Sequence, residues 1–248
     1  MISYEDKLAQ LVCGYSIKVK KDDLVLIRGE VCSEPLIKAC FKEVLKRGAH
    51  PLLRMTISEQ NALFFKYGQD HQFRYIPEID KLQAETVTSQ ISIESTDNSK
   101  QLTNMDSASI AKSQKVRGDL REIMFAREDK GEFSWIIAPY PTLAMAQEAE
   151  MSLEEYREFV YNACKLNEKD PVAAWEAVDK MQEDIVKRLT GSKTIRLTGV
   201  QTDLTLNVES RLWKSCAGQR NMPDGEVFTS PVEDSATGTI FFDIPTNY

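Results

Sequence analysis

The sequence has few of the residues and motifs on which many metal and nucleotide enzymes depend. Histidine occurs only as His50 and His71 among 248 residues, too far apart for the zinc-binding H-E-x-x-H motif. The glycine-rich G-x-G-x-x-G and G-x-x-x-x-G-K-[ST] motifs are absent, and so is the G-x-S-x-G nucleophile elbow. These absences argue against a helical zinc protease, a phosphate-cradling nucleotide enzyme and an elbow-type hydrolase.

Cysteine is present without an informative pattern. The sequence has an odd number of cysteines at irregular spacings and no C-x-x-C pair: Cys13, Cys32, Cys40, Cys164 and Cys216. A chain without a secretion signal keeps its thiols reduced. We therefore interpret the cysteines as small apolar packing residues.

Long apolar runs and basic runs are also missing. The longest apolar stretch, Trp135–Ala146, contains two prolines and is far shorter than the roughly 20 residues of a membrane-spanning helix. The first residues, Met1–Asp6, lack the basic and apolar regions of a signal peptide. A formal net charge of −7 disfavours binding to nucleic acid or anionic membranes. We expect a cytoplasmic protein with no nucleic-acid partner and no membrane partner.

The first three quarters of the chain alternate between strand and helix patterns. A strand at Asp23–Ile27, a helix at Glu34–Arg47 and a strand at His50–Met55 predict a βαβ unit with parallel strands. Further strands are expected at Ala84–Ser95, either as one strand or as two strands broken near Ser89, and at Trp135–Ala138. Further helices are expected at Tyr4–Tyr15, Ser58–Tyr67, Asn104–Arg127, Ser152–Leu166 (with Ser152 and Glu155 as a capping box) and Pro171–Leu189. The predicted fold class is α/β, with a parallel-type sheet flanked by helices.

The pattern changes after Gly191. Strand candidates follow one another with short turns and no helix between them: Lys193–Thr198, Asp203–Val208, Glu226–Thr229 and Thr239–Ile244. We therefore predict an α/β N-terminal domain at residues 1–190. Residues 191–248 would form the incomplete beginning of a β-rich catalytic region.

The densest candidate site lies near the end of the sequence. The turn Pro223-Asp224-Gly225 leads directly into a strand that begins with Glu226, so the direction of this carboxylate would be fixed from both sides. Such a carboxylate suits a divalent cation, and Asp224, Glu233 and Asp234 add negative charge nearby. The alternative interpretation is a solvated acidic hairpin.

Several runs resemble the M29 family of metallo-aminopeptidases, of the aminopeptidase S and T type. They are Tyr140-Pro141-Thr142, Met151–Tyr156, Thr202–Leu206 and above all Asn221-Met222-Pro223-Asp224-Gly225-Glu226-Val227-Phe228-Thr229. The resemblance covers essentially the whole chain. It implies an enzyme that removes N-terminal residues from peptide substrates with a pair of divalent metal ions, zinc or cobalt. It also implies that Glu226 is the first metal-ligating glutamate.

The sequence departs from the family pattern in one respect. In the family a second glutamate, two histidines, an aspartate and a catalytic tyrosine follow well downstream of the Asn221–Thr229 run, whereas this sequence ends at Tyr248. The resemblance therefore implies an N-terminal portion of an aminopeptidase, inactive alone, with Glu226 as its one metal ligand and no catalytic residue. We expect no metal ion to be bound stably by this chain.

Two other interpretations remain open at the level of sequence. The chain could be a free-standing, non-catalytic α/β module whose acidic end binds a cation or a protein partner, or an unrelated small-molecule enzyme that uses an α/β cleft. The final β-rich part would expose an unpaired edge near Ile240, Phe241 and Phe242. We therefore expect self-association into a homo-oligomer, such as a strand-exchanged dimer.

Overall fold

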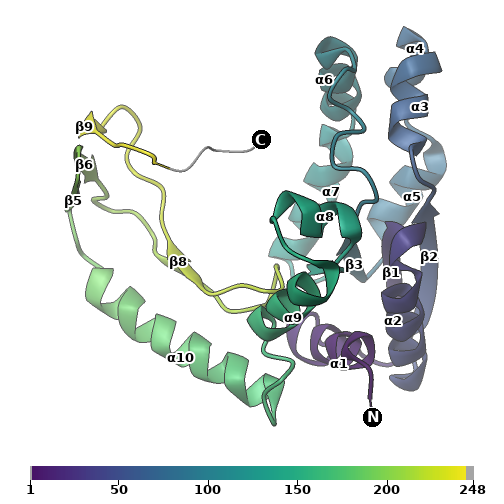
Figure 1. The fold of residues 1–248 in the computed structure, drawn as a ribbon, viewed down its shortest axis with the longest axis horizontal. Helices are drawn as coiled ribbons and strands as arrows, with labels where there is room; N and C mark the ends of the chain where they lie inside the picture. The colour runs from purple at the N-terminus through teal and green to yellow at the C-terminus, as the bar shows by residue number, and fades with distance from the viewer. Residues whose placement is uncertain (1, 244–248) are drawn as a thin grey trace. The chain divides into compact units, whose positions relative to one another are not determined.

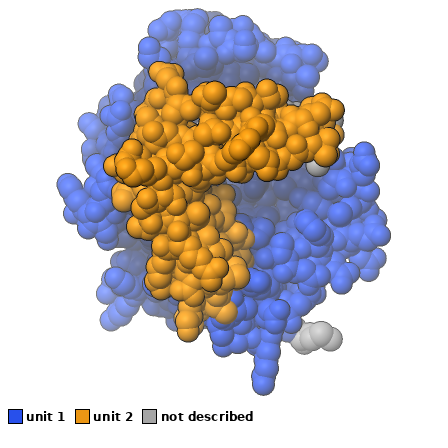
Figure 2. All heavy atoms as spheres, turned by 90° about the vertical axis from the view of Figure 1, so that its left-hand side faces the viewer, with its two compact units in different colours: residues 1–174, 218–223 blue, residues 175–217, 224–248 orange. Residues whose placement is uncertain are grey.

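The computed structural model describes residues 2–243, and the chain divides into two compact units. Residues 1–174 and 218–223 make up the first unit, and residues 175–217 and 224–248 make up the second (Figure 2). The predicted division into domains at residue 191 stays a prediction, because units grouped by contacts need not coincide with domains that fold on their own.

The first unit contains a four-stranded parallel sheet in the order β2-β1-β3-β4 (Figure 1). Its strands are β1 (Leu24–Glu30), β2 (His50–Thr56), β3 (Ser89–Glu94) and β4 (Ser134–Pro139). The register aligns Ile27 of β1 with Ile91 of β3, and Ile91 with Ile136 of β4, and all three isoleucines are fully buried. The central strands thus form the core, and the predicted α/β class with a parallel sheet is confirmed.

The first unit also contains α-helices, a π-helical turn and a 3-10 turn. They are α1 (Tyr4–Leu11) with the turn Val12–Ser16, α2 (Glu34–Lys46) after the 3-10 turn Val31–Ser33, α3 (Gln60–Tyr67), α4 (Asp70–Phe73), α5 (Glu78–Thr86), α6 (Ser107–Val116), α7 (Gly118–Asp129), α8 (Leu143–Glu148) and α9 (Leu153–Ala163). Helix α1 packs against α2, α4 against α6, and α5 against α7 (Figure 1). The predicted capping box of α9 is confirmed, since the side chains of Ser152 and Glu155 each accept from the other's backbone N–H.

Two predicted elements of the first unit differ in the structure. The single helix predicted at Asn104–Arg127 is two helices, α6 and α7, which meet at Arg117 and Gly118. Glycine has a low helix propensity, which favours an interruption at this position. The strand predicted at Ala84–Ser95 begins only at Ser89, because residues up to Thr86 complete α5.

The cysteines follow their expected role in part. Cys13, Cys40 and Cys164 are completely buried in the first unit, which confirms that these three are packing residues. Cys32 and Cys216 are only partly buried.

The second unit contains most of helix α10 (Pro171–Leu189) and two small antiparallel sheets. One sheet has the order β5-β6-β9, with β5 (Thr194–Gly199), β6 (Thr202–Asn207) and β9 (Thr237–Thr239), and the other pairs β7 (Lys214–Cys216) with β8 (Glu226–Phe228). The predicted β-rich segment after Gly191 is confirmed. The strand predicted at Thr239–Ile244 overlaps β9 only at Thr239, and its last residue lies outside the described residues.

No helix within residues 2–243 is both long enough and apolar enough to cross a membrane.

Candidate metal centre

Strand pairing places Cys216 directly opposite Glu226. Strands β7 and β8 run antiparallel, with Cys216 paired to Glu226, Ser215 to Val227 and Lys214 to Phe228. Directly opposed residues in an antiparallel pair project their side chains from the same face of the sheet. The two side chains are therefore neighbours although nine residues separate them in the sequence.

The predicted turn brings a second carboxylate to the same place. Gly225 has a φ of 127°, which other residues rarely adopt, and its backbone N–H donates to the carbonyl oxygen of Cys216 (3.1 Å) and to Oδ1 of Asp224 (3.0 Å). One backbone amide thus holds both the end of β7 and the carboxylate of Asp224. These bonds act on Asp224 and on the end of β7, and the predicted orientation of Glu226 by the Pro223-Asp224-Gly225 run stays a prediction.

The potential ligand atoms of Cys216, Asp224 and Glu226 all lie within 4.8 Å of one another. Cys216 and Asp224 are partly buried and Glu226 is exposed. Zinc binds sulfur at about 2.3 Å and carboxylate oxygen at about 2.0–2.2 Å, so tetrahedral ligands lie roughly 3.3–3.8 Å apart. Small side-chain adjustments would bring the three atoms around one ion. The donor set therefore fits a divalent metal.

Helix α10 fixes the strand that carries Cys216. The hydroxyl of Ser215 lies 3.0 Å from Oδ1 of Asp179 and 3.0 Å from Oε1 of Gln182, both on α10. Gln182 is almost completely buried. Because successive side chains of a strand point to opposite faces, this contact directs Ser215 toward α10 and Cys216 away from it.

The other candidates from the sequence lie apart from this cluster. Glu233 forms an ion pair with Arg211 at 2.5 Å, and its own backbone amide and this arginine lower the pKa of Glu233. Asp234 occupies a turn with φ of 60°. Both histidines are exposed residues of the first unit. Nε2 of His50 lies 3.9 Å from Oδ1 of Asp22. Within residues 2–243, only Cys216, Asp224 and Glu226 form a group of three potential metal ligands.

Sequence reasoning placed Glu226 and named Asp224 as a neighbouring charge, but it missed Cys216. The three-residue strand β7 gave no recognisable alternation, so nothing indicated its pairing with β8. The one available signal was a cysteine shortly before a turn that is followed by a strand.

The carboxyl edge of the parallel sheet carries a different set of side chains. Glu30 ends β1, and Cys32 follows it, with Sγ 4.0 Å from Oε2 of Glu30. Burial, and next the charge of Asp97, raise the pKa of Glu30, and burial raises the pKa of Cys32. Acidic groups repel phosphate, and a thiol with a raised pKa is a poor nucleophile at neutral pH. This edge does not favour a nucleotide or nucleophilic enzyme.

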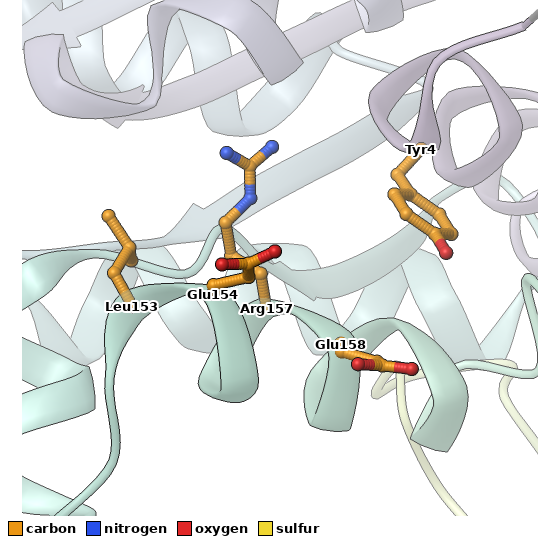
Figure 3. A pocket seen from close by; sticks show the side chains of 5 residues that line it. All are labelled: Tyr4, Leu153, Glu154, Arg157 and Glu158. Carbon is orange, nitrogen blue, oxygen red and sulfur yellow. The ribbon is translucent and has the colours of Figure 1, made fainter.

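An open pocket of about 710 Å³ lies between α1 and α9 of the first unit (Figure 3). It is lined by Tyr4, Leu153, Glu154, Arg157 and Glu158. Arg157 donates to Oε1 of the largely buried Glu5 at 2.9 Å, and the ring of Tyr4 stacks on that of Tyr161 at 4.8 Å. The arginine is thus already paired, and its contacts join the two helices.

Known aminopeptidases are similar to this chain over nearly its whole length. It is 23% identical to Aminopeptidase 2 of Geobacillus stearothermophilus over 98% of this chain and 64% of the relative. It is also 23% identical to Aminopeptidase AmpS of Bacillus subtilis (strain 168), over 100% of this chain and 66% of the relative. The chain therefore spans about two thirds of the length of these relatives.

A solved structure shows that the fold is shared. Wild-type AmpT from Thermus thermophilus aligns with 94% of this chain and 62% of its own, with a TM-score of 0.76 and 18% identity. The family model described as thermophilic metalloprotease (M29) matches residues 3–248. Since that match covers nearly the whole sequence and agrees with the Asn221–Thr229 run, the chain belongs to the M29 family of thermophilic metalloproteases.

Proposed function

We propose that this chain provides the N-terminal α/β part and the first metal ligand of a metal-dependent aminopeptidase, an enzyme that removes N-terminal residues from peptides. Membership of a metalloprotease family and the names of the aligned aminopeptidases support this proposal. The observation that carries it is the position of Glu226, which starts β8 directly after the Asp224-Gly225 turn and faces Cys216.

The residues of the cluster suit a metal that takes part in hydrolysis. A bound divalent ion would lower the pKa of a coordinated water and polarise the peptide carbonyl. The chain's own contribution is orientation: the Gly225 amide holds the Asp224 carboxylate, and strand pairing sets the Glu226 side chain beside it. Zinc or cobalt is the ion we infer, because the resemblance to the M29 family implies one of these two.

We propose that the chain does not hydrolyse peptides by itself. Two-metal hydrolysis needs ligands for both ions. Residues 2–243 contain a single group of three potential ligands, and His50 and His71 do not belong to it. The second ion and the catalytic groups would have to come from residues other than these.

Two further properties belong to the same proposal. The five thiols fit a reducing compartment such as the cytoplasm. Among residues 2–243, strand β9 pairs with β6 alone, and it is followed by Ile240, Phe241 and Phe242, which are 42%, 50% and 65% exposed. An apolar segment beside an open strand edge favours homo-oligomer formation, which light scattering at increasing protein concentration would test.

The test combines turnover with metal binding. Leucine and phenylalanine para-nitroanilides are incubated with the 248-residue chain and added Zn²⁺ or Co²⁺, and calorimetry measures metal binding. We expect no turnover, and metal binding that is lost in Glu226→Gln and retained in Glu233→Gln, a matched exposed glutamate outside the cluster.

Two results would contradict the proposal. Metal-dependent turnover abolished by Glu226→Gln would show that the chain holds a complete centre. Metal binding that is unchanged in Glu226→Gln would remove the glutamate from the site. To separate an aminopeptidase from a free-standing cation-binding module, the source DNA is read past the codon for Tyr248. An in-frame segment with two histidines supports the aminopeptidase, and a stop codon without such a neighbouring frame supports the module.

A further inference from the structure

We propose that one face of the parallel sheet carries a second binding site, where Arg28, Arg54 and Arg117 together hold a phosphate group. All three arginines belong to the first unit, and none belongs to the candidate metal centre. The inference therefore goes beyond the proposed aminopeptidase role and does not depend on it.

Strand pairing sets two of the arginines side by side. Strands β1 and β2 are parallel, and their register pairs Arg28 with Arg54. Adjacent strands lie about 4.8 Å apart, so the two side chains leave the same face of the sheet as close neighbours. On the other side of Arg28, the register pairs it with Ser92 of β3, whose hydroxyl stands in the same row.

Helix α7 covers this face and supplies the third arginine. Met124 of α7 packs against the core cluster that contains Leu26, and Leu26 lies on the same face of β1 as Arg28 because two residues separate them. Arg117 directly precedes α7 with helical dihedral angles and lies seven residues, about two turns, before Met124. It therefore belongs to the side of the helix that Met124 presents to the sheet.

The three guanidinium groups have too few carboxylates to neutralise them. Arg54 donates from Nη1 to Oδ1 of Asp80 on α5 at 2.7 Å. Within residues 2–243, the side chains of Arg28 and Arg117 form no hydrogen bond and no ion pair. Burial, and next the charges of Arg54 and Arg117, lower the pKa of Arg28, whereas the charge of Asp80 raises it. Three arginines and one aspartate leave a net charge of +2 in a chain whose formal net charge is −7.

Glu30 is the next residue on this face of β1, and the loop after β3 holds its carboxylate. That carboxylate forms hydrogen bonds with the side chain of Gln101 and with the backbone of Asp97. Glu30 is thus paired with the loop and not with an arginine of the site.

The site is open to solutes and suits a phosphate group. Arg28 is exposed although its strand lies between β2 and β3, so the helices leave this part of the sheet uncovered. A guanidinium binds two oxygens of a phosphate or a carboxylate at once. A phosphate group carries about −1.5 to −2 charges at pH 7, which matches the +2 of the cluster, whereas a monocarboxylate would leave one charge uncompensated.

Calorimetry with inorganic phosphate tests the site in the 248-residue chain at constant ionic strength. We expect one phosphate to bind per chain, and acetate to bind at least about tenfold more weakly. Phenyl phosphate distinguishes two sources of the same group. Equal or tighter binding of this ester indicates a phosphate-bearing molecule as the ligand, and weaker binding indicates the free ion; both results support the site.

Variants assign the binding to the arginines. Hydrogen bonds from charged groups are strong enough that Arg28→Met and Arg117→Met should each weaken phosphate binding at least about tenfold. Arg121→Met is the matched control, because Arg121 is an exposed arginine on α7, and it should retain the affinity.

Thermal unfolding separates a binding role of Arg28 from a structural one. Without phosphate, Arg28→Met should unfold at the same Tm as the wild type or higher, because the substitution removes repulsion from Arg54 and Arg117. Phosphate should raise the Tm of the wild type, and this rise should be lost in the variant.

Four results would overturn the inference. They are no phosphate binding by the wild-type chain, equal binding of acetate and phosphate, equal weakening in Arg121→Met and Arg28→Met, and an Arg28→Met variant with a lowered Tm and unchanged phosphate binding. None of them involves Glu226, so this inference and the proposed function fail independently.

Discussion

Arg127 on α7 holds together the connection between α5 and β3, and its replacement should destabilise the first unit. Its Nη1 donates to the carbonyl oxygens of Ala84 (2.8 Å) and Val87 (2.7 Å), and its Nη2 donates to that of Glu132 (3.2 Å). The side chain is 15% exposed. Since the last carbonyls of a helix have no partner within it, the guanidinium satisfies groups at the end of α5 that would otherwise be unpaired.

The expected cost follows from these contacts. Methionine keeps much of the apolar stem of Arg127 but removes every donor. A hydrogen bond from a charged group contributes about 1.5–3 kcal/mol, and the two carbonyls at the buried residues Ala84 and Val87 account for most of the loss. Water can replace the bond to the exposed Glu132. We therefore expect Arg127→Met to lower the free energy of unfolding by about 3 kcal/mol, which is roughly 6–12 °C in Tm.

Thermal unfolding followed by circular dichroism measures this change. Arg121→Met is the matched control, because Arg121 is an exposed arginine on the same helix. Its Tm should change by about 1–2 °C or less, as expected for surface substitutions. Arg127→Lys should fall between the wild type and Arg127→Met, since one ammonium cannot reproduce the arginine fork. Equal Tm values for Arg127→Met and Arg121→Met would refute the reasoning.

Two further predictions concern titration. Hydrogen bonds, first from Arg74 and then from Lys112, lower the pKa of Asp70 to about 2, below its unfolded value of about 3.9. The stabilisation from the ionised Asp70 is therefore present above about pH 4 and is lost as the pH falls toward 2. Carbon NMR of the Asp70 carboxyl should give a titration midpoint near 2, and this midpoint should rise in Lys112→Met. An unchanged midpoint in the variant would contradict this prediction. Burial raises the pKa of the Cys13 and Cys164 thiols to about 12 and also raises the pKa of the Cys40 thiol. Since the thiolate is the reactive form, a disulfide reagent at pH 8 should modify these three cysteines only after the protein unfolds. Fast labelling of these cysteines in the native protein would contradict it.

The local sequence was sufficient for much of the fold. The parallel βαβ arrangement of β1, α2 and β2 follows from apolar periodicity, which involves residues close to one another in the sequence. The capping box at Ser152 and Glu155 is equally local. The limits of this reasoning appear at Gly118, where one long helix became two, and at Ala84, where apolar alternation was mistaken for a strand although α5 continues to Thr86.

The candidate site also has one part that the local sequence predicts and one part that depends on strand pairing. The Pro223-Asp224-Gly225 turn drew attention to Glu226, because such a turn depends on adjacent residues alone, and the family resemblance of the Asn221–Thr229 run predicted its role as a ligand. The pairing of Cys216 with Glu226 was not accessible from the sequence. A three-residue strand carries too little pattern to set a register, and that register is fixed by contacts with residues far away, such as those of Ser215 with Asp179 and Gln182.

The sequence by itself thus determined the fold class, the family resemblance and the one carboxylate that this resemblance identifies as a metal ligand. Tertiary structure alone decided that Cys216 stands beside Glu226, and that Glu233, which is close in the sequence, pairs with Arg211 instead. Turns and caps are set by hydrogen bonds among neighbouring residues. The membership of a site is set by strand pairing between separated segments, and only the folded chain brings those segments together.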